Sequence, residues 1–346
     1  MKKRGRWALV AGFAAIALLA AACSDVSDDE PAGGDTGTGA AEVPDNSDTT
    51  VTLAINAWIG SEANVAVAQK LLADQLGYTV ETVEIDEFAQ FPALQSGEVD
   101  ATLEVWPSGH AKDYKKYIES GAGVVDAGEL GVIGQIGWWI PTYLVDENPD
   151  LATWEGLQGN ESMFSTSETG NSGQLLDGDP SFVTFDQAIA DNLGLDLKVV
   201  YAGSEAAQLT ALESAYENEE PFLFYFWTPH WAQSKYDLTM VELPEVTAQC
   251  EEAAAGDVDA YACAYPEDVL YKAINADLET RAPAAFAFLQ AMNWSNEDQN
   301  EVGLAISGGD PEGGSATDPE EAAQTWIDAN QDVWQPWVDA GLAAQG

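Results

Sequence analysis

Tryptophan residues stand at the ends of several predicted strands, where their rings could form the walls of a binding site. The chain contains 12 tryptophans in 346 residues. Trp58, Trp106 and Trp227 each close an apolar, strand-like run and lie close to a glycine or a proline. Core packing explains one buried tryptophan well, but it explains a set of strand-end aromatics less well. Because ligands of open α/β sheets sit beyond the carboxyl ends of strands, we expect these rings to converge on one cleft.

Converging ring faces favour one class of ligand. Each aromatic face attracts a desolvated cation by about 0.5–2 kcal/mol. A quaternary ammonium group has no N–H donor, so hydrogen bonds cannot recognise it and ring faces must. Trp139 and Tyr143, in the segment 137–143, compete for a further wall of the site. The sequence therefore predicts an aromatic cage for a small quaternary ammonium compound.

A zwitterionic ligand also needs donors for its anionic end, and two places offer them. Ile59, Gly60 and Ser61 precede or open a predicted helix, where free N–H groups bind carboxylates. Gly60 would allow the backbone to approach the ligand closely. His230 is the second candidate donor, although a buried structural histidine explains it equally well.

Two further polar residues are interpreted mainly as structural. Glu104 lies two residues before Trp106, so the two side chains share one strand face. Its carboxylate would either face a cationic ligand or pair with a donor of the protein, and the second interpretation is favoured. His110 fits the start of a helix or the surface better than a binding site.

The sequence lacks the motifs of common enzyme classes. It contains no Gly-x-Ser-x-Gly, no His-Glu-x-x-His and no phosphate-binding loop, and only two histidines. Neither a cofactor nor a metal site is predicted. The alternative hypothesis is an exported carbohydrate-acting or wall-binding protein, with tryptophan platforms and a carboxylate pair. A purely structural surface lipoprotein is a third, weaker interpretation.

The first residues predict export and lipid attachment. Residues 1–22 combine four basic residues with an uncharged apolar run and end in three alanines before Cys23. This is the pattern of a signal peptide, and small residues directly before a cysteine resemble the bacterial lipobox. We expect a lipid on Cys23 and an extracytoplasmic, membrane-anchored protein. Residues 23–50 hold almost no large apolar side chains and are expected to form a flexible tether.

The charge excludes two classes of partner. Residues 1–22 hold four of the 12 basic residues and none of the 59 acidic ones, so the remainder carries a formal net charge of −51. Nucleic acid and anionic membrane surfaces both require a basic face, so neither is an expected partner. Contact with the membrane is expected only through the lipid. Cys250 and Cys263 are expected to form a disulfide, as a cysteine pair in an exported protein usually does.

Strands and helices alternate after residue 50, which predicts an α/β fold with mostly parallel sheets. The length of this part suits two lobes better than one small core. The last hundred residues are predicted to be mainly helical. The clearest predicted strands are 51–58, 78–85 and 100–106, and residues 136–145 are predicted as a strand pair or a strand with a proline break. The clearest predicted helices are 61–77, 88–99 and 112–120.

Four segments resemble the glycine betaine/choline substrate-binding proteins of ABC importers. The Trp-Thr-Pro-His-Trp element at 227–231 is the most specific part of this resemblance. The resemblance implies a type II periplasmic-binding-protein clamp, whose two lobes close on a ligand and then dock an importer permease. The four segments are residues 94–114, 137–144, 222–238 and 322–341.

The resemblance also carries over individual residues. Trp106 and Trp227 match tryptophans of the family's aromatic box, and Trp58 and Tyr143 resemble aromatic residues of the choline-type relatives. Two departures stand out. Residues 165–175 lack a further cage tryptophan that some members have, and their Ser, Thr and Asn side chains could bond a carboxylate or hydroxyl instead. Gly60 replaces an acidic residue of the choline-type relatives, which disfavours choline.

The combined expectation is an osmoprotectant receptor rather than an enzyme. Glycine betaine is the first candidate ligand, and proline betaine and choline remain open. Residues 51–141 together with 240–346 are expected to form one lobe, and residues 142–239 the other. Each lobe is expected to be a mostly parallel sheet flanked by helices.

Overall fold

The computed structural model describes residues 43–308 and 315–345. The predicted signal peptide and lipidation site, Cys23, lie outside this part of the chain. The strands of the described residues are β1 (Asn46–Ile55), β2 (Tyr78–Glu84), β3 (Ala101–Val105), β4 (Val124–Pro141), β5 (Gly173–Asp177), β6 (Leu197–Tyr201), β7 (Phe224–Thr228), β8 (Leu238–Met240) and β9 (Glu267–Asn275).

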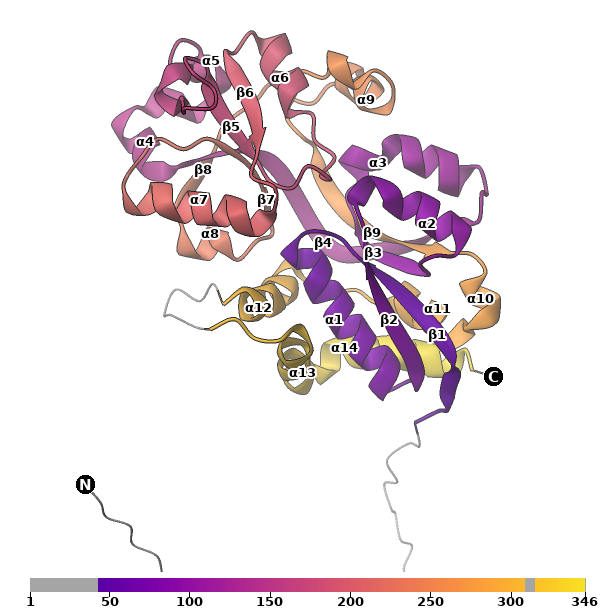
Figure 1. Ribbon diagram of the computed structural model, residues 1–346. Coiled ribbons are helices and arrows are strands. Elements are labelled where there is room, and N and C mark those ends of the chain that lie inside the picture. The colour runs from indigo at the N-terminus through magenta and orange to yellow at the C-terminus, as the bar shows by residue number, and fades with distance from the viewer. Residues whose placement is uncertain (1–42, 309–314, 346) are drawn as a thin grey trace, which may run out of the picture. The chain divides into compact units, whose positions relative to one another are not determined.

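These strands form one sheet with two parallel groups. The order is β2-β1-β3-β9-β4-β7-β5-β6, and β8 pairs with β4. β1 is parallel to β2 and β3, and β5 is parallel to β6 and β7. β4 runs antiparallel to both β9 and β7 and passes from one group to the other (Figure 1). We call the part around β1–β3 the β1 lobe and the part around β5–β7 the β5 lobe. The predicted two-lobed α/β fold is confirmed.

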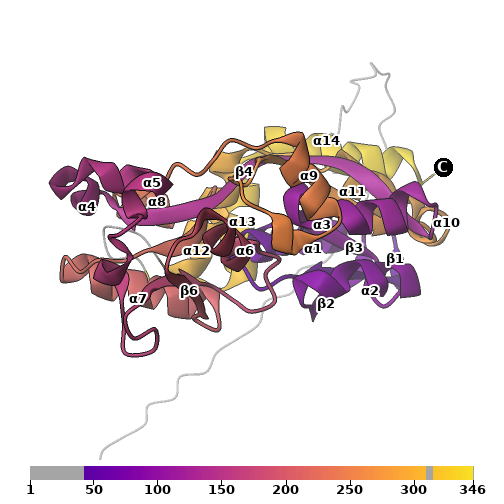
Figure 2. The same cartoon turned by 90° about the horizontal axis from the view of Figure 1, so that it is seen from above.

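Helices cover both faces of the β1-lobe sheet (Figure 2). Successive residues of β1 point to opposite faces. Leu53 joins the larger core, with α1 and the C-terminal helices, whereas Ala54 joins a second core with residues of α2. The helices are α1 (Ile59–Asp74), α2 (Gln90–Ser96), α3 (Pro107–Asp113), α4 (Thr142–Glu147), α5 (Trp154–Leu157), α6 (Asp186–Leu193), α7 (Glu205–Glu217), α8 (Ala232–Lys235), α9 (Ala248–Ala255), α10 (Leu278–Arg281), α11 (Pro283–Ala291), α12 (Asn296–Ser307), α13 (Pro319–Ala329) and α14 (Gln331–Ala343).

The strand predicted at 136–145 differs most from the structure. β4 begins much earlier, at Val124, and ends at Pro141. Glycines interrupt the strand-like residue pattern of its first half in the sequence. Gly128 and Gly131 adopt φ of +88° and +93° where the register with β9 shifts, and such irregularities usually require glycine. The prediction is wrong beyond Pro141, because the chain turns there into α4.

Two other predictions also differ from the structure, the start of the first strand and the helical character of the C-terminal part. β1 starts at Asn46, inside the predicted tether, and the Asn46 side chain donates to the Leu76 carbonyl at 2.7 Å. β9 lies within the C-terminal part, which was predicted as mainly helical. β9 completes the sheet between β3 and β4, so its pairing depends on distant segments that a local pattern does not reveal.

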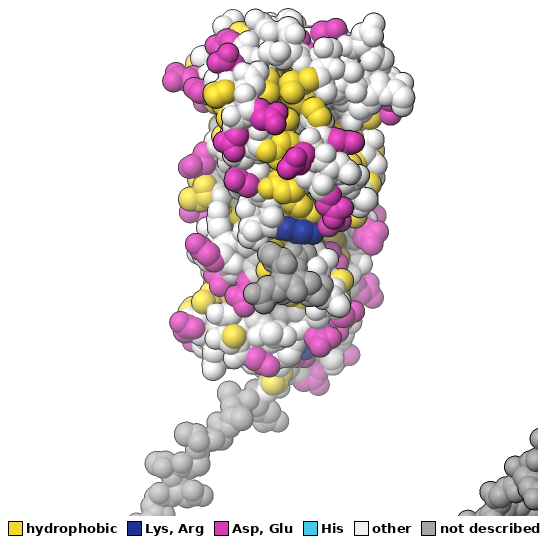
Figure 3. Space-filling view, turned by 90° about the vertical axis from the view of Figure 1, so that its left-hand side faces the viewer, with side chains coloured by type: hydrophobic (Ala, Val, Ile, Leu, Met, Phe, Trp, Pro, Cys, Tyr) yellow, Lys and Arg dark blue, Asp and Glu magenta, His cyan; other side chains and the backbone are white. Residues whose placement is uncertain are grey.

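The remaining predictions concern charge, cysteines and lobe boundaries. Acidic side chains are scattered over the face seen in Figure 3, and basic ones are few. Cys250 and Cys263 form a disulfide with a Cα–Cα distance of 6.2 Å. Among the described residues, no helix is both long and apolar enough to cross a membrane. The predicted lobe boundaries remain predictions, because the sheet continues through both lobes.

Candidate functional site

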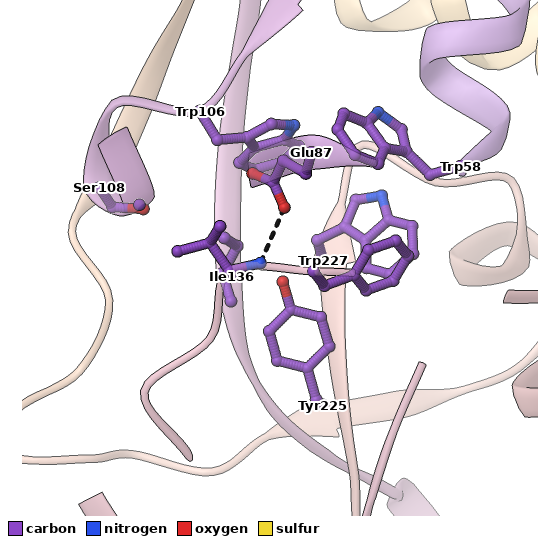
Figure 4. Close-up of a pocket in the computed structure, with 10 residues that line it drawn as sticks. Trp58, Glu87, Trp106, Ser108, Ile136, Tyr225 and Trp227 are labelled. Atoms are coloured by element: carbon purple, nitrogen blue, oxygen red, sulfur yellow. Dashed lines mark hydrogen bonds between the residues drawn. The ribbon is translucent and has the colours of Figure 1, made fainter. Parts of the chain in front are cut away.

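A small cavity lies where the two lobes meet. It comprises about 370 Å³ of space between side chains, part of which is open to solvent. The β1 lobe and β4 contribute one part of its wall, and the β5 lobe contributes the other (Figure 4). Its lining residues are Trp58, Glu87, Trp106, Ser108, Gly109, Ile136, Phe182, Val183, Tyr225 and Trp227.

Local structure places Trp58 and Trp106 at the carboxyl ends of parallel strands. Trp58 follows β1 and occupies the position before the first residue of α1, with extended φ and ψ of −144° and 154°. Trp106 follows β3 in the same way, and the proline after it is the first residue of α3. Proline suits the first turn of a helix, so this sequence fixes where the strand ends and the ring emerges. A Cβ atom on Gly134 would lie 2.3 Å from the Trp106 ring, so glycine in β4 leaves room for the indole.

The buried carboxylate of Glu104 connects these two indoles. Its Oε1 atom accepts hydrogen bonds from Trp58 Nε1 at 2.8 Å and from Trp106 Nε1 at 3.1 Å. Its Oε2 atom accepts from Asn64 Nδ2 at 2.7 Å. Burial raises the pKa of Glu104 to about 7, although these hydrogen bonds oppose the shift. The structural interpretation of Glu104 thus agrees with the geometry, and the same residue places a negative charge behind the cavity wall.

Gly60 makes room for this carboxylate. A Cβ atom at Gly60 would lie 2.7 Å from Glu104 Oε2 and 2.5 Å from Gln299 Nε2. The close backbone approach expected at Gly60 is therefore made to protein side chains in this structure. Any larger residue would push the carboxylate away from the two indoles that it holds.

The β5 lobe builds its wall from rings that contact one another. Phe182 lies in the loop after β5, and its ring meets Trp58 at 5.8 Å and Trp227 at 5.6 Å between centroids, both edge-on. Tyr225 and Trp227 lie two residues apart in β7 and so share one strand face. The Tyr225 hydroxyl points toward the Glu87 side of the cavity (Figure 4). Burial raises the pKa of Tyr225 well above its ordinary value, so the hydroxyl remains a donor.

Glu87 is the acidic residue of the lining. Its Oε2 atom accepts the backbone N–H of Val183 at 2.8 Å, and its Oε1 atom lies 2.9 Å from His110 Nε2. Burial lowers the pKa of His110, but hydrogen bonds and charges of Asp113 and Glu87 outweigh burial and raise it to about 9. The contacts of both ring nitrogens fix His110 behind the cavity wall. The expectation of a helix-start or surface residue is correct about the helix and wrong about the surface, since His110 is 1% exposed.

Ser108 is the other polar side chain of the β1-lobe wall. Its N–H and hydroxyl both donate to the Asp268 carboxylate, at 2.8 and 2.7 Å. Burial raises the pKa of Asp268 to about 6. No Lys, Arg or His side chain belongs to the lining residues. The described residues also contain no cluster of His, Cys, Asp and Glu that could hold a metal ion. The arrangement suits a compact cationic or dipolar ligand with methyl groups that pack against rings.

The structure places the predicted carboxylate donors outside this lining. The Ile59 N–H donates to Glu205 Oε2 at 2.8 Å, and Ser61 Oγ accepts the N–H of Asn56. His230 is 1% exposed, and its Nε2 atom lies 3.0 Å from Glu205 Oε1. Its ring packs edge-on against Trp227 at 5.4 Å, so it supports that indole.

Trp139 and Tyr143 also lie away from the cavity. Trp139 Nε1 donates to the Phe226 carbonyl at 3.2 Å. Ile136 of β4 lines the cavity, and Trp139, three residues further on, points to the opposite face of the strand. Tyr143 belongs to α4, where its hydroxyl donates to the Glu220 carbonyl at 2.7 Å.

Several lining residues escaped sequence reasoning. Tyr225 could have been found, because it lies two residues before Trp227 on the same strand. Phe182 lies in an irregular loop, and Glu87 lies in a short 3-10 turn, so neither has a periodic signal. Residues 165–175, which were expected to replace a cage tryptophan, contribute nothing to this lining.

Comparisons with known proteins agree with this fold. A family model described as the substrate-binding domain of an ABC-type glycine betaine transport system matches residues 49–329. The trimethylamine N-oxide-binding protein of Pelagibacter ubique strain HTCC1062 is 28% identical over 275 residues, covering 77% of this chain and 83% of that protein.

Solved structures share the two-lobed architecture. Lactococcal OpuAC, in its closed conformation with glycine betaine, has a TM-score of 0.64 at 22% identity, over 84% of this chain and 99% of that one. An ABC-transporter choline-binding protein in complex with choline has a TM-score of 0.66 at 17% identity, over 85% and 96% of the two chains. The predicted type II periplasmic-binding-protein fold is confirmed.

Proposed function

Because the chain belongs to the family of substrate-binding domains of ABC-type glycine betaine transport systems, we propose that it binds a small methylated ammonium compound in the cavity between its lobes. Proteins of this family are substrate-binding components of importers and not enzymes. The alternative of a carbohydrate-acting protein has no support in this family. Glycine betaine is the first candidate ligand.

One observation carries the proposal. Three indoles and two further aromatic rings surround a single cavity whose lining contains no cationic side chain. Each ring face contributes about 0.5–2 kcal/mol to a desolvated cation. Glu104 adds negative charge behind the rings when it is ionised, and Glu87 lies beside them paired with His110. Both the ring faces and the ionised Glu104 favour a positive ligand group.

The anionic end of a betaine would meet one free hydroxyl donor in this arrangement. The donors expected at Ile59 and His230 are occupied by Glu205. Tyr225 presents a hydroxyl in the lining, whereas the Ser108 hydroxyl already donates its proton to Asp268. A carboxylate placed here would also approach Glu87, and that repulsion reduces the advantage of a fully charged anionic end.

The single free hydroxyl of Tyr225 favours trimethylamine N-oxide as a second candidate. Its single oxygen requires fewer donors than a carboxylate, and its methylated nitrogen presents the same face to the rings. A relative that matches most of this chain is named for binding it. Choline, which lacks an anionic end, is the third compound that the wall would accept.

Isothermal titration of residues 43–346 with glycine betaine, trimethylamine N-oxide and choline tests the proposal. We expect saturable one-site binding in the micromolar range, about −8 kcal/mol, for at least one of them. The order of the three affinities identifies the ligand. Absence of heat with all three, from protein shown to be folded by circular dichroism, would contradict the proposal.

Delivery and anchoring complete the proposed function. We propose that Cys23 carries a lipid that holds the protein at the outer side of the membrane, where it passes ligand to an importer permease. The support for the anchor is the signal-like segment and the small residues before Cys23. The full chain and a Cys23→Ser variant should separate into membrane and soluble fractions, respectively. A membrane-bound Cys23→Ser variant would contradict the lipid anchor.

A further inference from the structure

Two glutamates cross the cleft between the lobes in the same way. Glu87 of the β1 lobe accepts the backbone N–H of Val183 in the β5 lobe at 2.8 Å. Glu205 of the β5 lobe accepts the backbone N–H of Ile59 in the β1 lobe, also at 2.8 Å. Each lobe therefore lends one carboxylate and one backbone donor to the other.

Each of these glutamates is held by one of the chain's two histidines. Glu87 Oε1 lies 2.9 Å from His110 Nε2, and Glu205 Oε1 lies 3.0 Å from His230 Nε2. The histidine belongs to the same lobe as its glutamate in both cases. The two Glu–His pairs are thus assembled within single lobes, and only the bond to the opposite backbone depends on the lobes being together.

The two pairs differ in what the second ring nitrogen contacts. His230 Nδ1 accepts the N–H of Ala232 at 3.0 Å, so its Nε2 atom donates to Glu205. His110 faces a carboxylate on each ring nitrogen, Glu87 on one side and Asp113 on the other.

The position of Ile59 makes its N–H a strong donor. Ile59 is the first residue of α1, a helix of 16 residues. Its N–H has no partner within the helix, and the helix dipole favours negative charge at this end. Glu205 is 8% exposed and supplies that charge from the other lobe.

We propose that Glu87 and Glu205 are positioning residues that hold the lobes closed around the ligand. The inference rests on the proposed function only in that a ligand occupies the closed cavity. Because both carboxylates are preassembled, closure orders little beyond the two N–H···O bonds. Loss of either bond lowers the population of the closed form, and the apparent affinity falls in proportion.

Glu205 gives the cleaner test, because it does not belong to the cavity lining, whereas Glu87 does. Glu205→Ala removes the acceptor, and Glu205→Gln keeps an oxygen without the charge. Glu213→Gln is the matched control. Glu213 lies on the same helix, α7, and its carboxylate pairs with Lys235 within its own lobe.

Stopped-flow tryptophan fluorescence with the best ligand separates the two rate constants. We expect Glu205→Ala to raise the dissociation rate constant at least tenfold, with the association rate constant changed less than about twofold. Glu205→Gln should recover part of the loss, and Glu213→Gln should match the unaltered chain. An unchanged dissociation rate constant in a folded Glu205→Ala variant would overturn the proposal.

Hydrogen exchange of the ligand-free protein gives a second readout that needs no ligand. The amide of Ile59 should exchange at least tenfold faster in Glu205→Ala, while amides in the middle of α1 keep their rates. If the unaltered chain bound none of the compounds, the proposed function would fail, and this exchange result would still decide the closure proposal. Equal exchange of Ile59 in both proteins would refute it.

Discussion

The β1 lobe holds its two tryptophans through one buried carboxylate, whereas the β5 lobe holds Trp227 through contacts between rings. Trp58 and Trp106 donate to the same oxygen of Glu104. Trp227 instead packs against Phe182, Tyr225 and His230. The first wall depends on a single acceptor, and the second is spread over several independent contacts.

This difference predicts different responses to substitution. A ring cluster loses one contact at a time, so its losses should be graded. Removal of the shared acceptor leaves two buried indole N–H groups without a partner, and each of these costs about 1–3 kcal/mol. A single substitution of Glu104 should therefore disturb the positions of both tryptophans in the β1-lobe wall.

Removal of the Glu104 side chain should have the largest effect. In Glu104→Ala both indoles lose their acceptor, and a charge that favours the cation disappears. Asn64 keeps the Gly60 carbonyl and Gln299 as acceptors. We expect about 100-fold weaker binding, or about 2.8 kcal/mol, together with a lower free energy of unfolding in urea. Glu104→Gln keeps an acceptor oxygen and should lose clearly less affinity. Equal losses in the two variants would show that charge, and not the position of the rings, is what Glu104 supplies.

Truncation of the β5-lobe wall should come next. Trp227→Ala removes one ring face and should weaken binding at least tenfold with the fold intact, as measured by titration calorimetry. Trp139→Phe is the control, because Trp139 lies on the opposite face of the neighbouring strand. Unchanged affinity in folded Trp227→Ala would remove this residue from the cage.

A smaller effect should appear in the pH dependence. Glu104, with a pKa raised to about 7 by burial, is mostly protonated at pH 6 and mostly ionised at pH 8. A bound cation favours the ionised form, so affinity should rise as pH increases through about 7, by less than about tenfold. Tetramethylammonium is the suitable probe, because its charge does not titrate. The dependence of affinity on pH should largely vanish in Glu104→Gln. This variant retains the Asp268 carboxyl as an internal control. An equally strong pH dependence in Glu104→Gln would assign the effect to another group.

Ionisation of Glu104 should lower the stability of the folded protein, although it should raise the affinity for a cation. The folded state keeps a proton on Glu104 between its unfolded pKa, about 4.5, and its folded pKa, about 7. Its contribution to stability is therefore fully present below about pH 4.5 and is lost as pH rises through about 7. Urea unfolding of the unliganded protein and of Glu104→Gln at pH 5 and 8 would measure this contribution.

The smallest effect should be that of Tyr225→Phe. The variant keeps the ring and loses the hydroxyl, so a ligand with an oxygen acceptor should bind roughly threefold to tenfold more weakly, or about 0.5–1.5 kcal/mol for a hydrogen bond. Tetramethylammonium, which has no oxygen, should bind with unchanged affinity. A similar loss with both ligands would contradict a hydrogen-bonding role of Tyr225.

The sequence indicates lining residues of the cavity where strand ends have clear markers. Trp58 and Trp106 follow apolar strands and precede helix starts, and Trp227 lies two residues before a proline. Their role in binding remains a prediction. Tyr143 looked equivalent after Pro141, but α4 begins at once and turns the side chain away. The direction of the chain after a proline depends on what the next segment packs against.

The contacts across the cleft had no local signal. Glu87, Phe182 and Glu205 belong to turns or helix starts whose partners lie far away in the sequence. The sequence also suggested that Gly60 makes room for a ligand, whereas it makes room for Glu104. These features depend on how β4 joins the two lobes. The first half of β4 contains glycines, and the sequence did not identify it as a strand.

A crystal structure of residues 43–346 with the tightest-binding ligand tests the central claim most directly. The account predicts methyl carbons within about 6 Å of the ring centroids of Trp58, Trp106 and Trp227, the reach of a cation–π contact. The ligand oxygen should point toward the Tyr225 hydroxyl. A ligand located outside these three rings, for example in the groove between Trp231 and Glu62, would contradict the assignment of this cavity as the binding site.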